Sequence, residues 1–400
     1  MALLPVAEAR ALILAEVEPL SRETVALAEA HGRVLAEDLE ASRDQPPFAA
    51  SAMDGYAVRA QDIATLPASL KIIGKVPAGR RFQGAVGPGE AVRIFTGAPV
   101  PEGADTIVIQ ENAAEAGDVV TVTADTPPGK NIRHAGLDFR RGAVVLLAAS
   151  VLSPRAIGLA AAMNLPRLPV RRRPVVAILA TGDELVAVGD RPRDDQVMSS
   201  NSHALAAMVR QFGGVPENLG IVGDEVAATE RAIAKAAGAD ILVTIGGASV
   251  GEHDLVRSAL EQRGIGIAFW QIAMRPGKPL MFARSGGQRI IGLPGNPVSA
   301  LLCARIFLKP LIERLLGLAP EETLVKARLE TALPANDQRE DYMRATLKRA
   351  SDGTMTAAAF PRQDSSMQVT LHAAQGLIVR PPFAPTAAPG DIVEVMEIDF

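Results

Sequence analysis

Acidic residues stand directly after two segments of this chain that have the composition of buried strands. Asp183 and Glu184 follow the apolar run 175–180, and Asp224 follows the run 218–223. Because the carboxyl ends of parallel strands meet at one edge of a sheet, all three carboxylates are expected to face one crevice. A phosphate ligand there needs a cation, and hard oxygen ligands beside phosphate imply Mg²⁺. The alternative, that Asp183 or Glu184 caps a following helix, is expected to hold for one of them.

A glycine-rich segment, GGASVGEHD, occupies residues 246–254 between a predicted strand and a predicted helix. Gly246 and Gly247 let the backbone turn sharply and direct free N–H groups at an anion, although turn geometry alone also explains them. The spacing fits neither G-x-G-x-x-G nor the P-loop, which disfavours a dinucleotide or a Walker-type nucleotide site. Asp254 either caps the following helix or binds metal or substrate.

Two proline-rich segments add positive charge and a helix start. In GLPGNPVSA (292–300), Asn296 occupies an N-cap position and Pro297 the first turn of a helix. An exposed helix amino terminus is also a natural phosphate site. RPGKP (275–279) supplies Arg275 and Lys278, which its prolines hold in place as counter-charges.

Residues in the first third of the chain leave their chemistry open. Asp54 in SAMDGYAV is explained by a turn as well as by catalysis. Thr96, before Gly97, either closes a strand or binds a ligand. The five histidines lack metal-ligand spacing, and no G-x-S-x-G is present, which disfavours zinc and serine hydrolases.

The composition excludes several classes of protein. The net charge of −4 has the wrong sign for a protein that binds nucleic acid by neutralising phosphates. Cys303 is the single cysteine, so an intrachain disulfide and a cysteine-based zinc site are excluded, and a buried thiol is expected. Charged residues within the first apolar stretch argue against a signal peptide, and no run approaches the ~18 apolar residues of a membrane span. We expect a soluble, cytoplasmic protein.

The order of the elements predicts a multidomain α/β plus β protein. Helices are expected over 3–18, 25–38 and from Ser153, and short β segments fill 46–140. From Pro174 strands alternate with helices, which predicts a parallel α/β domain, and short strands return after Pro320. The predicted domains cover 1–45 with 140–172, an all-β domain (46–139), an α/β domain (173–318) and a C-terminal β domain (322–400).

Seven motifs, in order along nearly the whole chain, resemble the MoeA-type molybdopterin molybdenumtransferases. They are SAMDGYA, IFTGAPVPEGADTIV, TGDEL, GGASVGEHD, RPGKP, GLPGNPVSA and RQDSSM. The resemblance implies molybdenum insertion into molybdopterin, the last step of molybdenum cofactor synthesis. Adenylylated molybdopterin and molybdate are the implied substrates, and AMP is released with Mg²⁺. It also implies an elongated discontinuous region (1–45 and 140–172) with the β domain inserted into it, an α/β domain of the molybdopterin-binding type and a C-terminal β-barrel-like domain. A homodimer whose active site lies at the subunit interface is implied as well. A molybdopterin adenylyltransferase and molybdoenzyme apoproteins are further partners to expect.

The resemblance also implies roles for individual residues. Asp54, Glu184 and Asp138 are assigned to catalysis, and Asp183, Asp224 and Asp254 to the metal and pyrophosphate. The residues assigned to substrate binding are Thr96, Gly246, Gly247, Ser249, Arg275, Lys278, Gly295, Asn296, Arg344 and Ser365. Arg275 departs from the family, which commonly has lysine there; arginine keeps the charge but not a deprotonatable amine.

Three alternatives stay open from the sequence. A molybdopterin adenylyltransferase shares the α/β domain, but its TGGTG-like loop differs from TIGGASVG here. A non-catalytic carrier or scaffold would retain the fold and the pterin site. Tungstate is a tetrahedral oxyanion so similar to molybdate that the sequence does not separate them.

Overall fold

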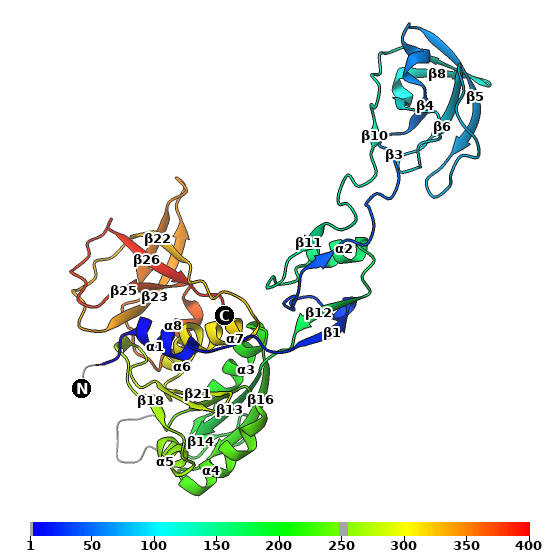
Figure 1. Ribbon diagram of the computed structural model, residues 1–400. Coiled ribbons are helices and arrows are strands. Elements are labelled where there is room, and N and C mark those ends of the chain that lie inside the picture. The colour runs from blue at the N-terminus through cyan, green and yellow to red at the C-terminus, as the bar shows by residue number, and fades with distance from the viewer. Residues whose placement is uncertain (1–2, 248–254) are drawn as a thin grey trace. The chain divides into compact units, whose positions relative to one another are not determined.

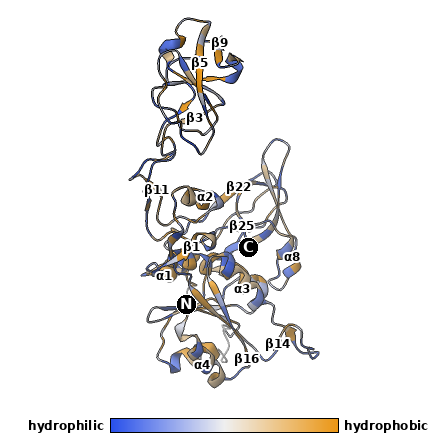
Figure 2. Cartoon of the chain, turned by 90° about the vertical axis from the view of Figure 1, so that its right-hand side faces the viewer, coloured by the Kyte–Doolittle hydropathy of each residue, from blue (hydrophilic) through white to orange (hydrophobic). Residues whose placement is uncertain are grey.

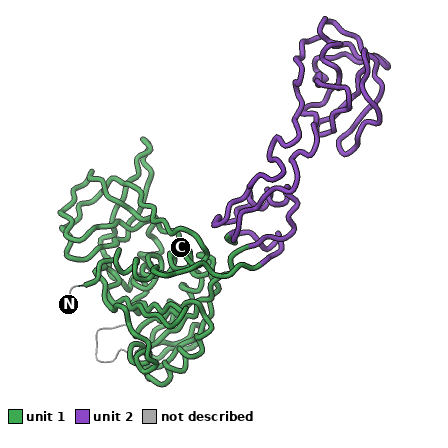
Figure 3. The backbone as a smooth tube through the Cα atoms, viewed as in Figure 1, with its two compact units in different colours: residues 1–23, 32–34, 170–400 green, residues 24–31, 35–169 purple. Residues whose placement is uncertain are grey.

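A computed structural model describes residues 3–247 and 255–400, and the chain divides into two compact units (Figure 3). The first unit comprises residues 1–23, 32–34 and 170–400, and the second comprises 24–31 and 35–169. The four predicted domains are a finer division than these units, and their bounds stay a prediction. Ser249 and Asp254 lie outside the described residues.

The first unit is built on a six-stranded sheet with the order β16-β13-β17-β21-β20-β18 (Figure 1). Strands β16, β13, β17 and β21 are parallel, and β13 lies between the strands that follow it in the chain. This order makes a topological switch point between β13 and β17, where ligands of open α/β sheets bind. The strands are β13 (Val175–Thr181), β16 (Val215–Val222), β17 (Ile241–Ile245), β18 (Ile267–Phe269), β20 (Met281–Ser285) and β21 (Gln288–Leu293).

The prediction of a parallel sheet is correct for four strands and wrong at one edge. Strand β20 runs antiparallel to β21 and to β18. Only Gly286 and Gly287 separate β20 from β21, which leaves no room for the crossover that a parallel pair requires.

Alternate residues of β13 face two separate hydrophobic cores. Val176 and Ile178 pack on one side of the sheet, and Ala177 and Leu179 pack on the other. Because both faces are covered, the strand reads as a continuous apolar run. The helices of this unit are α1 (Val6–Leu14), α3 (Asn201–Gln211), α4 (Val226–Lys235), α5 (Leu255–Gln262), α6 (Pro297–Cys303), α7 (Lys309–Leu315) and α8 (Gln368–Ala373).

The predicted helix after Asn296 contains an irregular turn. Residues 304–308 form a π-helical turn between α6 and α7. Pro310 has no N–H to donate to the preceding turn, and a π turn accommodates such a defect. Cys303, at the end of α6, is fully buried and free, as predicted.

The C-terminal part of the first unit is a closed β-barrel of five strands, which confirms the barrel-like prediction. The order is β23-β24-β22-β26-β25, and β25 pairs again with β23. The short strand β19 adds to β23 in parallel. Their bounds are β19 (Met274–Arg275), β22 (Leu324–Leu329), β23 (Glu340–Arg349), β24 (Met355–Ala359), β25 (Gly376–Arg380) and β26 (Ile392–Glu397).

The second unit contains a six-stranded sheet with the order β7-β4-β6-β5-β9-β8. Hydrophobic residues line β5 in Figure 2 and pack into cores that include Leu70 and Val76. The strands are β4 (Gly55–Val58), β5 (Ala68–Val76), β6 (Glu90–Ile94), β7 (Thr106–Ile109), β8 (Ala113–Ala116) and β9 (Val119–Val122).

Short strand pairs and one helix complete the architecture. The helix α2 (Pro154–Ala162) begins as predicted, because the Ser153 hydroxyl accepts a hydrogen bond from the Ala156 N–H at 3.2 Å. The remaining pairs are β1 (Arg22–Ala26) with β12 (Arg167–Arg171), β2 (Leu39–Glu40) with β11 (Val144–Leu146), β3 (Ala50–Ser51) with β10 (Ile132–Arg133), and β14 (Leu185–Val186) with β15 (Val197–Met198).

The predicted helix over 25–38 is wrong. Residues up to 26 belong to β1, a single 3-10 turn follows at Leu27–Glu29, and Gly32 takes a φ of +72°. Pairing of β1 with β12 overrides the helical preference of the alanine-rich sequence. Within the described part of the chain, none of the helices combines the length and apolar character needed to cross a membrane.

Candidate active site

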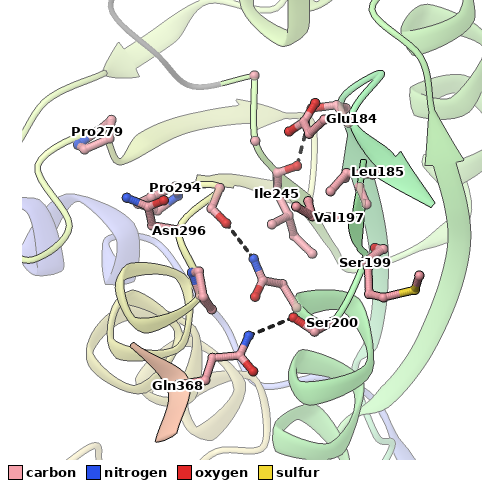
Figure 4. A pocket seen from close by; sticks show the side chains of 18 residues that line it. Glu184, Leu185, Val197, Ser199, Ser200, Ile245, Pro279, Pro294, Asn296 and Gln368 are labelled. Carbon is pink, nitrogen blue, oxygen red and sulfur yellow. Dashed lines mark hydrogen bonds between the residues drawn. The ribbon is translucent and has the colours of Figure 1, made fainter. Parts of the chain in front are cut away.

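A cavity of about 590 Å³ lies at the switch point of the sheet (Figure 4). The last residues of β13 and β17 line it, together with the loop before α6. It brings together five of the predicted site residues, Glu184, Gly246, Gly247, Gly295 and Asn296. These residues come from three separate strand ends, so the topology assembles the predicted constellation.

Glu184 is held beside the end of β13 by an unusual backbone conformation. Gly182 takes a φ of +144°, and a Cβ built on it would lie 2.4 Å from Glu184 Oε2 and 2.7 Å from Cδ. A side chain at position 182 would therefore strain the backbone and push the Glu184 carboxylate aside. The glycine of TGDEL is required for the position of this carboxylate.

Asp183 and Asp224 are joined by one hydrogen bond, and their assignment to a metal stays a prediction. The Asp224 N–H donates to Asp183 Oδ1 at 3.0 Å, so the ends of β13 and β16 are joined at these residues. Neither Asp183 nor Glu184 caps a helix, because β14 follows them, and that alternative is wrong. No group of three potential ligands occurs among the described residues, and Asp254 lies outside them. The chemistry of these residues fits Mg²⁺, which commonly takes one or two carboxylates with phosphate oxygens and water, but the Asp183 carboxylate already accepts the Asp224 N–H.

Gly246 and Gly247 have structural reasons to be glycine. Their φ values are +85° and +65°, and a Cβ would lie 2.7 Å from the Thr181 carbonyl oxygen at the first and 2.8 Å from Val256 Cγ2 at the second. Local geometry therefore accounts for both glycines, and their proposed contact with substrate rests on their position in the cavity.

The amino terminus of α6 is occupied by the segment before α8. Asn296 holds the N-cap position, but its side chain does not cap the helix; its amide donates to Ser365 Oγ at 2.8 Å. The Val298 N–H donates to the Ser365 carbonyl oxygen at 3.0 Å, and Pro297 has no N–H. The N–H groups of this first turn are thus less open to phosphate than the sequence indicated.

Arg275 is bonded to the barrel. Its guanidinium donates to Asn336 Oδ1 at 3.1 Å and to Asp337 Oδ2 at 3.4 Å, and it forms an ion pair with Asp341. The bond to Asp341 raises the pKa of Arg275. Lys278 is exposed, and its side chain has no partner among the residues that the structure describes. Arg275 is therefore bonded to protein groups, whereas the ammonium group of Lys278 bonds to none of the described residues.

Arg344 is almost completely buried, with 1% of its surface exposed. Its N–H and Nε both donate to Gln363 Oε1, at 3.0 and 3.2 Å, and Nη1 donates to the Met367 carbonyl oxygen at 3.3 Å. Burial lowers the pKa of Arg344, and Nη2 has no described partner. The side chain therefore positions the segment that carries Ser365.

In the second unit, Asp54 is bonded to Thr96. Asp54 Oδ1 accepts the Thr96 N–H and hydroxyl, both at 2.8 Å. These two bonds lower the pKa of Asp54, with a smaller contribution from Arg93. Two residues that the sequence analysis singled out separately are therefore bonded to each other, and Asp54 is held ionised.

Asp138 lines another cavity of the second unit, of about 380 Å³. Gly97, the neighbour of Thr96, lines it as well. Asp138 therefore shares this cavity with the residue that follows Thr96, although neither Asp54 nor Thr96 lines it.

Comparisons with known proteins decide the family. The profile of the MoeA N-terminal region (domain I and II) matches residues 4–164, that of a probable molybdopterin binding domain matches 177–314, and that of the MoeA C-terminal region (domain IV) matches 326–398. A molybdopterin molybdenumtransferase 2 of Mycobacterium tuberculosis is 36% identical over 94% of this chain and 95% of its own length. The chain belongs to the molybdopterin molybdenumtransferase family.

Other members of the molybdopterin molybdenumtransferase family agree. The Nostoc protein is 39% identical over 81% of this chain and 77% of its own length. A crystal structure of the molybdopterin biosynthesis MoeA protein from Pyrococcus horikosii superposes with a TM-score of 0.85 at 28% identity and covers 99% of both chains. The family consists of transferases of molybdenum cofactor biosynthesis, and the multidomain fold predicted from the sequence is confirmed.

Three residues of the cavity at the switch point were not predicted from the sequence. Ser200, Asn201 and Gln368 line it or bond across it. Gln368 donates to Ser200 Oγ at 2.8 Å and so joins the start of α8 to the start of α3. Ser199 and Ser200 directly precede α3, which begins at Asn201, and such a cap signal could have drawn attention to this segment. Nothing in the sequence around Gln368 indicates its position.

Proposed function

We propose that this chain inserts molybdenum into molybdopterin, with adenylylated molybdopterin and molybdate as substrates. The observation that carries the proposal is the Glu184 carboxylate, held over Gly182 in a glycine-lined cavity at the switch point. Membership of the family supports the same reaction.

The first chemical step is cleavage of the phosphoanhydride. One water adds across the bond between the two phosphates, which yields AMP and molybdopterin with its own phosphate. Asp183, Asp224 and Asp254 are proposed to hold Mg²⁺, which would neutralise charge on the leaving phosphate. Lys278 and Arg275 are proposed to add positive charge, and Gly246, Gly247 and Ser249 to bind the phosphates.

The second step transfers the metal. Both thiol protons of the substrate leave with one oxygen of molybdate as water, and molybdenum stays hexavalent. Glu184, Asp54 and Asp138 are proposed to move these protons. An ionised carboxylate has a free site to accept a proton, and the bonds from Thr96, which lower the pKa of Asp54, keep it ionised at neutral pH. The sulfur ligands belong to the substrate, consistent with a single buried cysteine in the protein.

We further propose a cytoplasmic homodimer in which the second unit of one subunit completes the site of the other. Mixing two inactive variants tests this arrangement. If Asp54 and Glu184 act from different subunits, exchange between Asp54→Asn and Glu184→Gln dimers restores one intact site in each mixed dimer. Random exchange then recovers about a quarter of the wild-type activity. No recovery after demonstrated subunit exchange would place both residues in one subunit.

The proposal is tested by its product. Purified protein, adenylylated molybdopterin, molybdate and Mg²⁺ should together activate a molybdenum-free apoenzyme, and the Asp54→Asn variant should not. Tight substrate binding without activation would indicate the carrier. Formation of adenylylated molybdopterin from ATP and molybdopterin would indicate the adenylyltransferase.

A further inference from the structure

The carboxylate of Asp54, in the second unit, uses only one of its two oxygens within the protein. Oδ1 accepts both bonds from Thr96, and Oδ2 accepts none from the residues that the structure describes. The Asp54 carbonyl oxygen accepts the Gln110 N–H at 3.1 Å. A Cβ on Gly55 would lie 1.9 Å from the Val108 carbonyl oxygen, so the backbone of this turn lies directly against β7. The position of the free oxygen therefore depends on where Gly55 and Gln110 lie.

A single guanidinium, that of Arg93, joins these two residues. Arg93 lies on β6, which pairs with β4 in the same sheet (Figure 1). Its Nη2 donates to Gln110 Oε1 at 2.7 Å, and its Nη1 makes a longer contact of 3.5 Å to the Gly55 carbonyl oxygen. The guanidinium carbon lies 4.8 Å from the centre of the Tyr56 ring and 5.3 Å from that of Phe95, so two rings restrict how the group can turn. One side chain thus bonds both sides of the acidic turn.

The direct effect of the Arg93 charge on Asp54 is small. The two bonds from Thr96 lower the pKa of Asp54 most, and Arg93 contributes least of the causes. Arg93 forms no ion pair with the described residues, and its side chain is half-buried rather than enclosed in a core. An arginine that adds little charge at the carboxylate, yet bonds both sides of its turn, acts on Asp54 through geometry.

We propose that Arg93 is a positioning residue for Asp54. By bonding Gly55 and Gln110, it fixes the turn so that one carboxylate oxygen meets Thr96 and the other stays free. The inference rests on the proposed function, in which Asp54 moves protons of the substrate. A lysine at position 93 would keep the charge, but an ammonium cannot bond both acceptors in one plane or stack on two rings.

A pair of variants separates geometry from charge. Arg93→Lys keeps the positive charge and removes the planar donor. Lys75→Met is the matched control, because Lys75 faces Arg93 across β5 and β6 and its ammonium lies 5.0 Å from the centre of the Phe95 ring. The Lys75 side chain has no hydrogen-bond partner among the described residues. The control therefore removes a charge from the same ring and leaves the bonds of the Asp54 turn intact.

Amide hydrogen exchange of Thr96, measured on the full chain, reports the bond to Asp54 without any turnover. Arg93→Lys should exchange this N–H about tenfold faster than wild type, the effect of weakening one hydrogen bond. The kcat of molybdenum insertion should fall about tenfold while KM stays within about twofold, because a displaced carboxylate impairs the transfer and not the binding. Lys75→Met should match wild type in all three quantities.

A further variant keeps the test decisive. Gln110→Met removes the acceptor of the same guanidinium and should change the exchange and kcat in the same direction, should Arg93→Lys fail to fold. Wild-type exchange and kcat in both variants, equal losses in Lys75→Met, or faster exchange spread over all of β4 and β6 would overturn the inference. If the chain inserts no molybdenum but Thr96 exchanges faster in Arg93→Lys, the proposed function is refuted and the role of Arg93 in the turn is supported.

Discussion

Replacing Gly182 with alanine should separate the position of Glu184 from the stability of the protein. The added Cβ would lie 2.4 Å from Glu184 Oε2, far inside van der Waals contact. The obstructing atoms are the end of a flexible side chain, so Glu184 can rotate away and relieve the clash. What remains is an alanine at a φ of +144°, which costs of order 1–3 kcal/mol. Activity should fall about a hundredfold even under conditions where the variant stays folded, because a reacting group displaced by about 1 Å costs that much.

Gly189 provides the matched control. Its φ is +103°, and no atom lies within 4 Å of the Cβ that an alanine would add. Gly189→Ala should therefore lose a similar free energy of unfolding and keep its activity. Unfolding is followed by denaturant titration with the fluorescence of Trp270, the single tryptophan, and activity by AMP release.

A double variant tests the cause of the lost activity. In a Glu184→Gln background, Gly182→Ala should add little to the loss, because both changes act on one carboxylate. Wild-type turnover in Gly182→Ala, or equal losses of activity in the two alanine variants, would refute the reasoning.

Two other predictions concern charge. Thr96→Val removes one donor to Asp54 and should raise the pKa of Asp54, so the acidic limb of the pH–activity profile should move to higher pH. Thr96→Ser keeps the hydroxyl and should retain the wild-type profile. If the limb does not move in Thr96→Val, the limb does not report the titration of Asp54. Burial raises the pKa of Asp399, but the ion pairs with Lys309 and Arg305 lower it by more, so the folded pKa is below the ordinary value. Asp399→Asn should therefore lower the free energy of unfolding by about 1 kcal/mol, a small value because the Asp399 side chain is 42% exposed. Because the folded pKa of Asp399 is lowered, the stabilisation by its ion pairs is present above pH 3.8 and is lost as the pH falls through the folded pKa. If wild type and Asp399→Asn still differ in stability below that pH, the ion pairs do not cause the difference.

The sequence predicted the strands of the first unit well, because their signal is local. Both cores cover β13, which makes Val175–Thr181 an unbroken apolar run that needs no further context. Carboxylates placed after such runs then meet at one edge, as Asp183 and Asp224 do. Residues 25–38 were less predictable, because their partners lie more than a hundred residues away: β1 pairs with β12, and the Leu35 and Ala36 N–H groups donate to the carbonyl oxygens of Ser150 and Pro169. Local helical preference is a weak guide where distant strands compete.

The cavity shows the same limit at the level of single residues. Asn296 looked like a cap from its place before Pro297, but its partner is Ser365, which no local pattern reveals. Gln368 reaches the cavity because α8 lies against α6 within one compact unit. A sequence motif indicates which residues carry chemistry, while the orientation of an amide depends on acceptors brought from elsewhere in the chain.

The most direct test of molybdenum insertion is AMP release from adenylylated molybdopterin by the purified chain, with molybdate and Mg²⁺ each present or omitted. Insertion predicts that release is fast only with both, and that AMP appears in a one-to-one ratio with molybdenum bound to the pterin. AMP release at the same rate without molybdate and Mg²⁺, or stable binding of the substrate without release, would contradict molybdenum insertion by this chain.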